Sequence, residues 1–147
     1  MEDRYLFKAK RLDNGEWEIG NLITNVFFRL GQSIPYILCS DKAEYDCFED
    51  FTEENGIFEV RPDTICQCTG LKDKHGNLIW ENDVVGFWDT YSTENGQAEM
   101  DCIGKVVWDD ETISFQVTNR LSADSYEVLD ECSVIGNIFD NPELINE

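Results

Sequence analysis

Hydrophobic and polar residues alternate in short runs along this chain, and turn signals separate the runs. Residues 16–19 and 113–117 alternate with a period of two, which is typical of a half-buried β-strand. Asp13-Asn14-Gly15 predicts a tight turn before the first of these runs, because glycine readily takes positive φ. Other short apolar runs predict strands at residues 5–10, 26–30, 34–38, 57–60, 78–80, 84–88, 105–108 and 133–138.

The residues beside these strands predict smaller features. Pro35 cannot donate a backbone hydrogen bond, so we expect its strand to lie at a sheet edge or to start there. Residues 61–64 predict one helical turn, and Gly76 is expected to be left-handed in a hairpin loop. Residues 89–101 are polar and predict a loop or an irregular hairpin tip. The acidic segment at residues 41–55 predicts either a short amphipathic helix or an acidic loop.

The spacing of strands and turns indicates an all-β fold with little helix. Short strands with a turn about every 8–12 residues are typical of a barrel or a sandwich. The strand order within residues 78–138 predicts a small SH3-like β-barrel, with a separate small β unit before it. We therefore expect an N-terminal β subdomain at residues 1–63, packed on a C-terminal SH3-like β-barrel subdomain at residues 64–147.

Composition places these strands on a folded and strongly acidic body. The 147 residues include 31 Asp and Glu against 11 Lys and Arg, a formal net charge of −20. The hydrophobic share of 41% and the aromatic share of 12% are too high for a disordered acidic tail. The charge argues against direct DNA binding, because the phosphate backbone would be repelled. It is uneven, at −7 over residues 1–70 and −13 over residues 71–147.

Location is predicted from what the sequence lacks and from its cysteines. No apolar run approaches the roughly 18 residues of a membrane span, and the N-terminus has no secretory signal pattern. We therefore expect a cytoplasmic protein with no membrane association. Its six cysteines are expected to be mostly buried, reduced thiols. Zinc or a disulfide remain alternatives, although Cys66-Gln67-Cys68 would point its two thiols to opposite faces of a strand.

The sequence offers no residue pattern typical of catalysis or of cofactor or metal binding. His75 lies in a predicted turn, with no base or nucleophile beside it in the sequence. The acidic run at residues 109–111 lacks the ligand spacing of a calcium loop and is interpreted as a solvated turn. We therefore expect a protein that is not an enzyme, with no catalytic, cofactor or metal residues. Tryptophans are typical of cores and of interfaces alike, and those of the candidate interaction surface are Trp80, Trp88 and Trp108.

One long segment of the chain matches a family motif. Residues 67–85 read Gln-Cys-Thr-Gly-Leu-Lys-Asp-Lys-His-Gly-Asn-Leu-Ile-Trp-Glu-Asn-Asp-Val-Val. They resemble the pattern Gln-Tyr-Thr-Gly-Leu-x-Asp-x-x-Gly-x-x-Ile-x-Glu-Gly-Asp-x-Val of the YopX family of phage and prophage proteins. Residues 134–144 resemble the closing motif of that family, and residues 7–20 resemble its N-termini. The chain departs from the pattern at Cys68, where the family has Tyr, and at Asn82, where it has Gly.

The resemblance implies a β-rich fold and a phage or prophage origin, and it implies no assigned catalytic residue. We expect a non-enzymatic accessory protein in the cytoplasm of the bacterial host, with an unidentified protein as partner. One alternative is an acidic DNA mimic that binds a host or phage DNA-binding protein with steep salt dependence. Another is a nucleic-acid-binding SH3-like module. Exposed strand edges are also consistent with a homo-oligomer.

Overall fold

The computed structural model describes residues 5–39, 56–119, 125–127 and 131–145 of the chain. It confirms the all-β prediction, because these residues form antiparallel strands and short 3-10 turns. The chain divides into two compact units, unit 1 from Met1 to Cys68 and unit 2 from Thr69 to Glu147. The sequence predicts a boundary after residue 63. The acidic segment at residues 41–55 lies outside the described residues.

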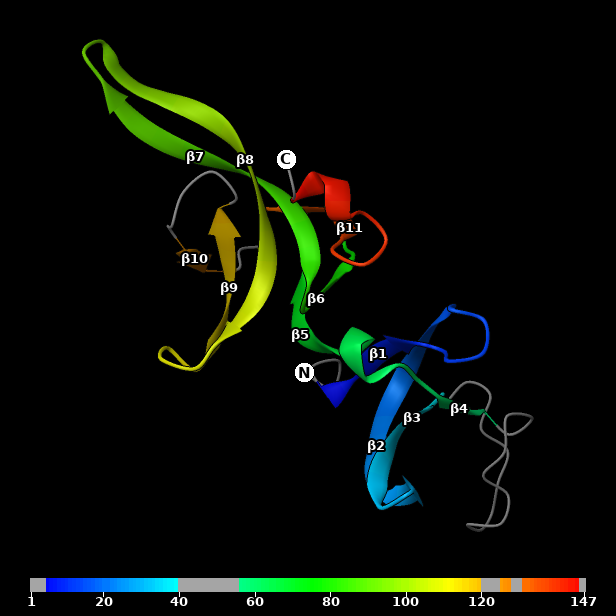
Figure 1. The fold of residues 1–147 in the computed structure, drawn as a ribbon. Coiled ribbons are helices and arrows are strands. Elements are labelled where there is room, and N and C mark those ends of the chain that lie inside the picture. Colours follow the sequence, from blue (N-terminus) through cyan, green and yellow to red (C-terminus); the bar gives the residue numbers. More distant parts are fainter. Residues whose placement is uncertain (1–4, 40–55, 120–124, 128–130, 146–147) are drawn as a thin grey trace. The chain divides into compact units, whose positions relative to one another are not determined.

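The strands of unit 1 follow the order β4-β3-β2-β1-β5 in a six-stranded antiparallel sheet, whose last strand, β6, pairs with β5 and belongs to unit 2 (Figure 1). The first two strands pair across the predicted turn, in which Gly15 has a φ of 73°. The predicted helical turn after the fourth strand is confirmed as η4. The elements are β1 (Phe7–Lys10), β2 (Trp17–Arg29), β3 (Gln32–Leu38), β4 (Ile57–Glu59), η4 (Pro62–Thr64) and β5 (Cys66–Lys72), which continues into unit 2.

β2 and β3 form a long hairpin in which two predicted strands are merged. The runs at residues 16–19 and 26–30 both lie largely within β2 (Trp17–Arg29), which bulges between Ile23 and Phe27 rather than ending in a turn. Pro35 lies in β3 opposite this bulge, where its missing N–H interrupts no regular ladder. The prediction that Pro35 marks a sheet edge or a strand start is wrong, since β3 begins at Gln32 and lies between β2 and β4.

The sheet of unit 1 curls around one small core. A single bridge joins Arg11 to Val60, and so links the end of β1 to the end of β4. On either side of it, Leu12 N donates to Glu59 O at 3.0 Å, and Arg61 N donates to Lys10 O at 2.8 Å. The core inside this curl contains the buried Ala9, Ile37 and Val60, with Phe7, Leu22 and Ile65 packed against them.

Unit 2 is built on a five-stranded antiparallel sheet in the order β10-β9-β8-β7-β11. Its described strands form an open sheet, so the SH3-like barrel is not confirmed. The core consists of Ile79, Val85, Val106, Val117 and Cys132, with Phe87, Phe115 and Val134 packed against them. The elements after β5 are β6 (Leu78–Trp80), β7 (Asp83–Thr93), β8 (Gly96–Asp109), β9 (Ser114–Asn119), β10 (Ser125–Glu127), β11 (Ser133–Asn137) and η5 (Pro142–Leu144).

The hairpin of β7 and β8 extends beyond the other strands of its sheet (Figure 1). β11 pairs with β7 only as far as Gly86, and β9 pairs with β8 only from Gly104 onward. We call residues 87–103 the arm; in the described structure its two strands pair with each other alone. The sequence predicts a loop or an irregular tip at residues 89–101, whereas the ladder runs without a break to Thr93 and Gly96. The prediction fails because Glu99 and Met100, consecutive residues of β8 on opposite faces of this hairpin, are both exposed, so the strand needs no apolar alternation.

The predicted turns of unit 2 are confirmed. Gly76 has a φ of 84° in the hairpin loop between β5 and β6. Asn82 has a φ of 71° in the tight turn before β7, which shows why the family pattern has glycine there. The tail closes with the short turn η5. In the described part of the chain, no helix has the length and apolar character needed to cross a membrane.

Candidate interaction site

The three tryptophans of the predicted interaction surface do not lie together. Trp80 is only 5% exposed, and its backbone N–H donates to Asp83 Oδ2 at 2.8 Å. Its neighbour Ile79 is fully buried, so the short strand β6 is covered on both faces. The prediction that Trp80 contributes to a surface is therefore wrong.

Trp108 is partly exposed, but its indole N–H and its ring both contact other residues of the protein. The exposed fraction of Trp108 is 43%. Its Nε1 donates to Asp110 Oδ1 at 2.7 Å. Its ring packs edge-on against the ring of Phe115, with 5.1 Å between the ring centroids. These contacts fasten the turn between β8 and β9, so they give Trp108 a structural role.

Trp88 is the most exposed of the three, with 58% of its surface accessible. It lies at the base of the arm, directly opposite Asp101 in the ladder. Asp101 and Trp108 are seven positions apart on the same uninterrupted strand, so they point to opposite faces. Trp88 and Trp108 therefore cannot form one patch, and Trp88 alone remains a candidate anchor for a partner.

The carboxylates that share the face of Trp88 are not neutralised within the described structure. Asp101 lies opposite Trp88, and Glu99 lies two positions farther along β8 on the same face. Both side chains are exposed. No ion pair of the described residues involves either of them. The arm also carries Asp89 and Glu94 but no Lys, Arg or His, so its four acidic residues have no compensating charge within the arm.

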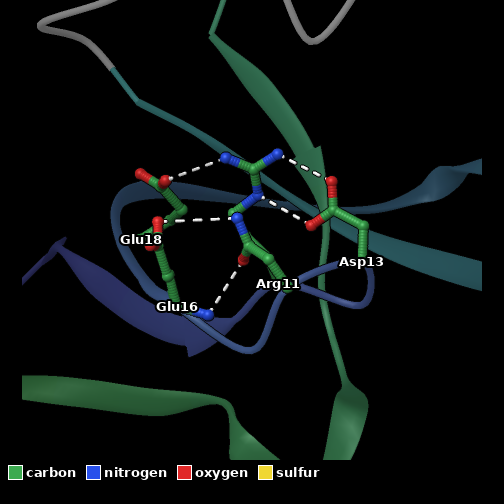
Figure 2. A network of polar contacts seen from close by, with 5 residues as sticks. Arg11, Asp13, Glu16 and Glu18 are labelled. Atoms are coloured by element: carbon green, nitrogen blue, oxygen red, sulfur yellow. Dashed lines mark hydrogen bonds and ion pairs between the residues drawn. The ribbon is translucent and has the colours of Figure 1, made fainter.

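Unit 1 contains the opposite situation, a polar network that is satisfied within itself. Figure 2 shows Arg11 forming two hydrogen bonds to Asp13, from Nε at 3.0 Å and from Nη2 at 2.7 Å. Its Nη1 lies 3.5 Å from Oε1 of the buried Glu18, and its backbone N–H donates to Glu16 O at 2.8 Å. The hydrogen bond from Arg11 lowers the pKa of Asp13. This network fixes the turn between β1 and β2.

Two hollows flank Leu12 and Glu59 in unit 1. The first, of about 320 Å³, is lined by Arg11, Leu12, Asp13, Phe58 and Glu59, and the guanidinium of Arg11 covers the ring of Phe58 at 4.2 Å. The second, of about 230 Å³, lies beside the tip of the β2–β3 hairpin and includes the ion pair of Arg29 with Glu59 at 3.1 Å. The arginines of both hollows are already engaged with carboxylates, so neither hollow offers a ready anion site.

A buried carboxylate that the sequence analysis missed organises unit 2. Asp73 accepts hydrogen bonds from the backbone N–H groups of His75, Asn77 and Val134, each at 2.9 Å. Burial raises the pKa of Asp73, but the backbone donors of Val134, Asn77 and His75 outweigh it and lower the pKa to about 2. The signal in the sequence was an aspartate three positions before Gly76. An aspartate at such a position often accepts hydrogen bonds from the backbone of its own turn. His75 contributes its backbone to this turn, as its predicted place in the loop implies.

The cysteines of the described residues fit the thiol prediction. Cys39, Cys66, Cys68, Cys102 and Cys132 are all buried and none forms a disulfide among the described residues. The Sγ of Cys66 donates to Thr64 O at 3.2 Å. Cys47 lies outside the described residues.

Comparison with known proteins assigns the family. The model of the family described as YopX protein matches residues 11–146, which is nearly the whole chain. The chain belongs to the YopX family. No curated protein matches it. The YopX motif at residues 67–85 encodes turns, because it supplies the left-handed Gly76 and Asn82 and the turn-capping Asp73.

Proposed function

We propose that this YopX protein is a non-enzymatic phage or prophage accessory protein that acts through protein–protein contact in the cytoplasm of the bacterial host. The observation that carries the proposal is the exposed indole of Trp88 on the arm. Tryptophan is favoured at the energetic centres of protein interfaces, because a large rigid ring buries much area at little entropic cost. The buried thiols of the described residues fit a reducing compartment.

The position of Trp88 supports a binding role over a structural one. The ring lies on the face of the arm opposite Phe87, which packs against the core of unit 2. Truncation of Trp88 should therefore leave that core unchanged. Single exposed apolar residues are common on protein surfaces, as Leu30 and Ile113 show here, but tryptophan is enriched at the energetic centres of interfaces.

An acidic DNA mimic is a second candidate, and the uncompensated carboxylates of the arm favour it. Such a mimic would bind the nucleic-acid site of a DNA-binding protein, so added DNA would displace it from its partner. The nucleic-acid-binding SH3-like alternative has less support, since the arm would repel phosphate.

Affinity capture from lysate of a host that carries the phage tests the proposal. The intact chain is compared with Trp88→Ser and with the matched control Leu30→Ser, which removes a side chain that is 99% exposed in unit 1. We expect the intact chain and Leu30→Ser to retain the same protein partner and Trp88→Ser to lose it. Retention by Trp88→Ser, or loss by Leu30→Ser alone, would show that the arm is not the interface.

A further inference from the structure

We infer that the face of the arm formed by Trp88, Glu99 and Asp101 docks a basic protein surface, and that it receives an arginine side chain of that partner. This inference rests on the proposed function and names the chemistry of its partner. Three properties of the arm lead to it: the placement of the ring beside the carboxylates, the absence of local compensation, and the pairing chemistry of guanidinium.

The ladder places the ring and the carboxylates on one face. Asp101 is the direct cross-strand partner of Trp88, and such pairs have Cβ atoms about 4.5–5.5 Å apart. Glu99 lies two positions from Asp101 on β8 and is therefore the diagonal cross-strand neighbour of Trp88. Residues in that relation are about 7–8 Å apart. A flat cation lying on the indole would therefore reach the carboxylate of Asp101 with its edge and lie near Glu99.

The described cations of unit 1 contrast with the acids on the face of Trp88, because they have partners within their own unit. Arg11, Arg29 and Arg61 each form an ion pair with a carboxylate of unit 1. Lys8 and Lys10 lie over the ring of Trp17, at 4.8 and 5.4 Å from its centroid. The exposed acids on the face of Trp88 have no such cation among the described ion pairs, although Lys105 lies farther along β8. The negative electrostatic field of Glu99 and Asp101 can therefore attract a partner of opposite charge.

Guanidinium satisfies both parts of the face at once. Its planar surface stacks on indole, and the contact contributes about 0.5–2 kcal/mol depending on how far it is desolvated. Its fork of N–H donors matches a carboxylate, whereas the ammonium of lysine is a compact and strongly hydrated charge. The face should therefore prefer arginine to lysine.

A peptide titration tests the inference with the full chain. The probe is a fluorescent peptide of alternating glycine and arginine, and the readout is its anisotropy at low and at physiological salt. The double variant Glu99→Gln/Asp101→Asn is compared with Glu111→Gln/Glu143→Gln, which removes the same charge from exposed positions elsewhere in unit 2. We expect the arm variant and Trp88→Leu each to weaken binding about 3- to 30-fold, and the control double variant less than about twofold.

Three results would overturn the inference. They are equal weakening by the two double variants, equal affinity for the matching lysine peptide, and no binding at low salt. The first would mean that the net charge of −20 attracts the peptide without a defined site. If Trp88→Ser still loses its partner in the capture experiment, the interaction stands and only the arginine chemistry is wrong.

Discussion

The carboxylate of Asp73 joins two segments of unit 2 that are 61 positions apart in the sequence. It caps the loop between β5 and β6, and its second oxygen accepts the N–H of Val134 at the start of β11. Asp73 is only 5% exposed. If its carboxylate were removed, little water could reach these backbone N–H groups to take its place as the hydrogen-bond acceptor. The residue should therefore matter for folding more than an ordinary turn aspartate.

We predict that Asp73→Asn lowers the free energy of unfolding by about 2 kcal/mol at neutral pH. The pKa of Asp73 is lowered from 3.8 to about 2 in the folded chain, so its contribution is complete above about pH 5. It is lost progressively as the pH falls from about 5 to 1, and the gap between variant and intact chain should close over that range. Urea unfolding across this pH range measures the gap. Asp101→Asn is the control, and a constant gap would contradict the account.

Arg11 and Arg61 form a natural comparison, because each pairs with an aspartate two positions later. Arg11 is largely buried, covers the ring of Phe58 and also reaches the buried Glu18, whereas Arg61 and Asp63 are both well exposed. We predict that Arg11→Ala lowers the free energy of unfolding by about 1–3 kcal/mol and Arg61→Ala by less than about 0.5 kcal/mol. Chemical denaturation of both variants tests this, and equal losses would sink the idea that burial makes the difference.

At the scale of elements, Gly104 shows what holds β8 against β9. A Cβ at Gly104 would overlap the carbonyl oxygen of Thr118, whereas a Cβ at Gly86 would meet only Cys102 O at 4.0 Å. We predict that Gly104→Ala separates the two strands, opens the core between Val106 and Val117, and costs at least about 3 kcal/mol. Gly86→Ala should change stability by less than about 1 kcal/mol. Thermal unfolding of the two variants tests this prediction. A small loss of stability in Gly104→Ala would contradict it and would show that β9 can move to accommodate the added Cβ.

The turns were the most predictable elements. Gly15 and Gly76 are left-handed as expected, and η4 begins at Pro62, because each depends on local backbone chemistry that the sequence states directly. The bulge of β2 was not predictable, since an apolar run such as residues 26–30 does not reveal whether it continues the strand before it. The outer part of the arm escaped prediction because its described β8 residues from Gly96 to Asp101 are mostly exposed and show no apolar alternation.

The candidate site was only partly predictable for a similar reason. The sequence supplies three tryptophans in apolar strands, but their exposure depends on whether one or both faces of each strand are covered. β6 is covered on both faces and buries Trp80, while the arm is not and exposes Trp88. Tertiary contacts decide this difference, and no local pattern encodes it.

At the scale of the whole molecule, the uneven charge becomes interpretable. The cations among the described residues of unit 1 contact carboxylates and aromatic rings of that unit, whereas unit 2 carries most of the excess negative charge and exposes part of it on the arm. Solubility needs no such separation, because scattered acids would serve equally. The basic partner that we propose for the arm would account for both the charge and the exposed tryptophan.

Site-specific photo-crosslinking in the phage-bearing host tests this central claim most directly. A photoreactive amino acid replaces Glu99 on the arm, and matched versions carry it at the exposed positions Glu143 in unit 2 and Leu30 in unit 1. The account predicts a discrete adduct with a second protein from position 99 and none from the other two. An adduct from position 30 or 143 with none from position 99 would contradict it.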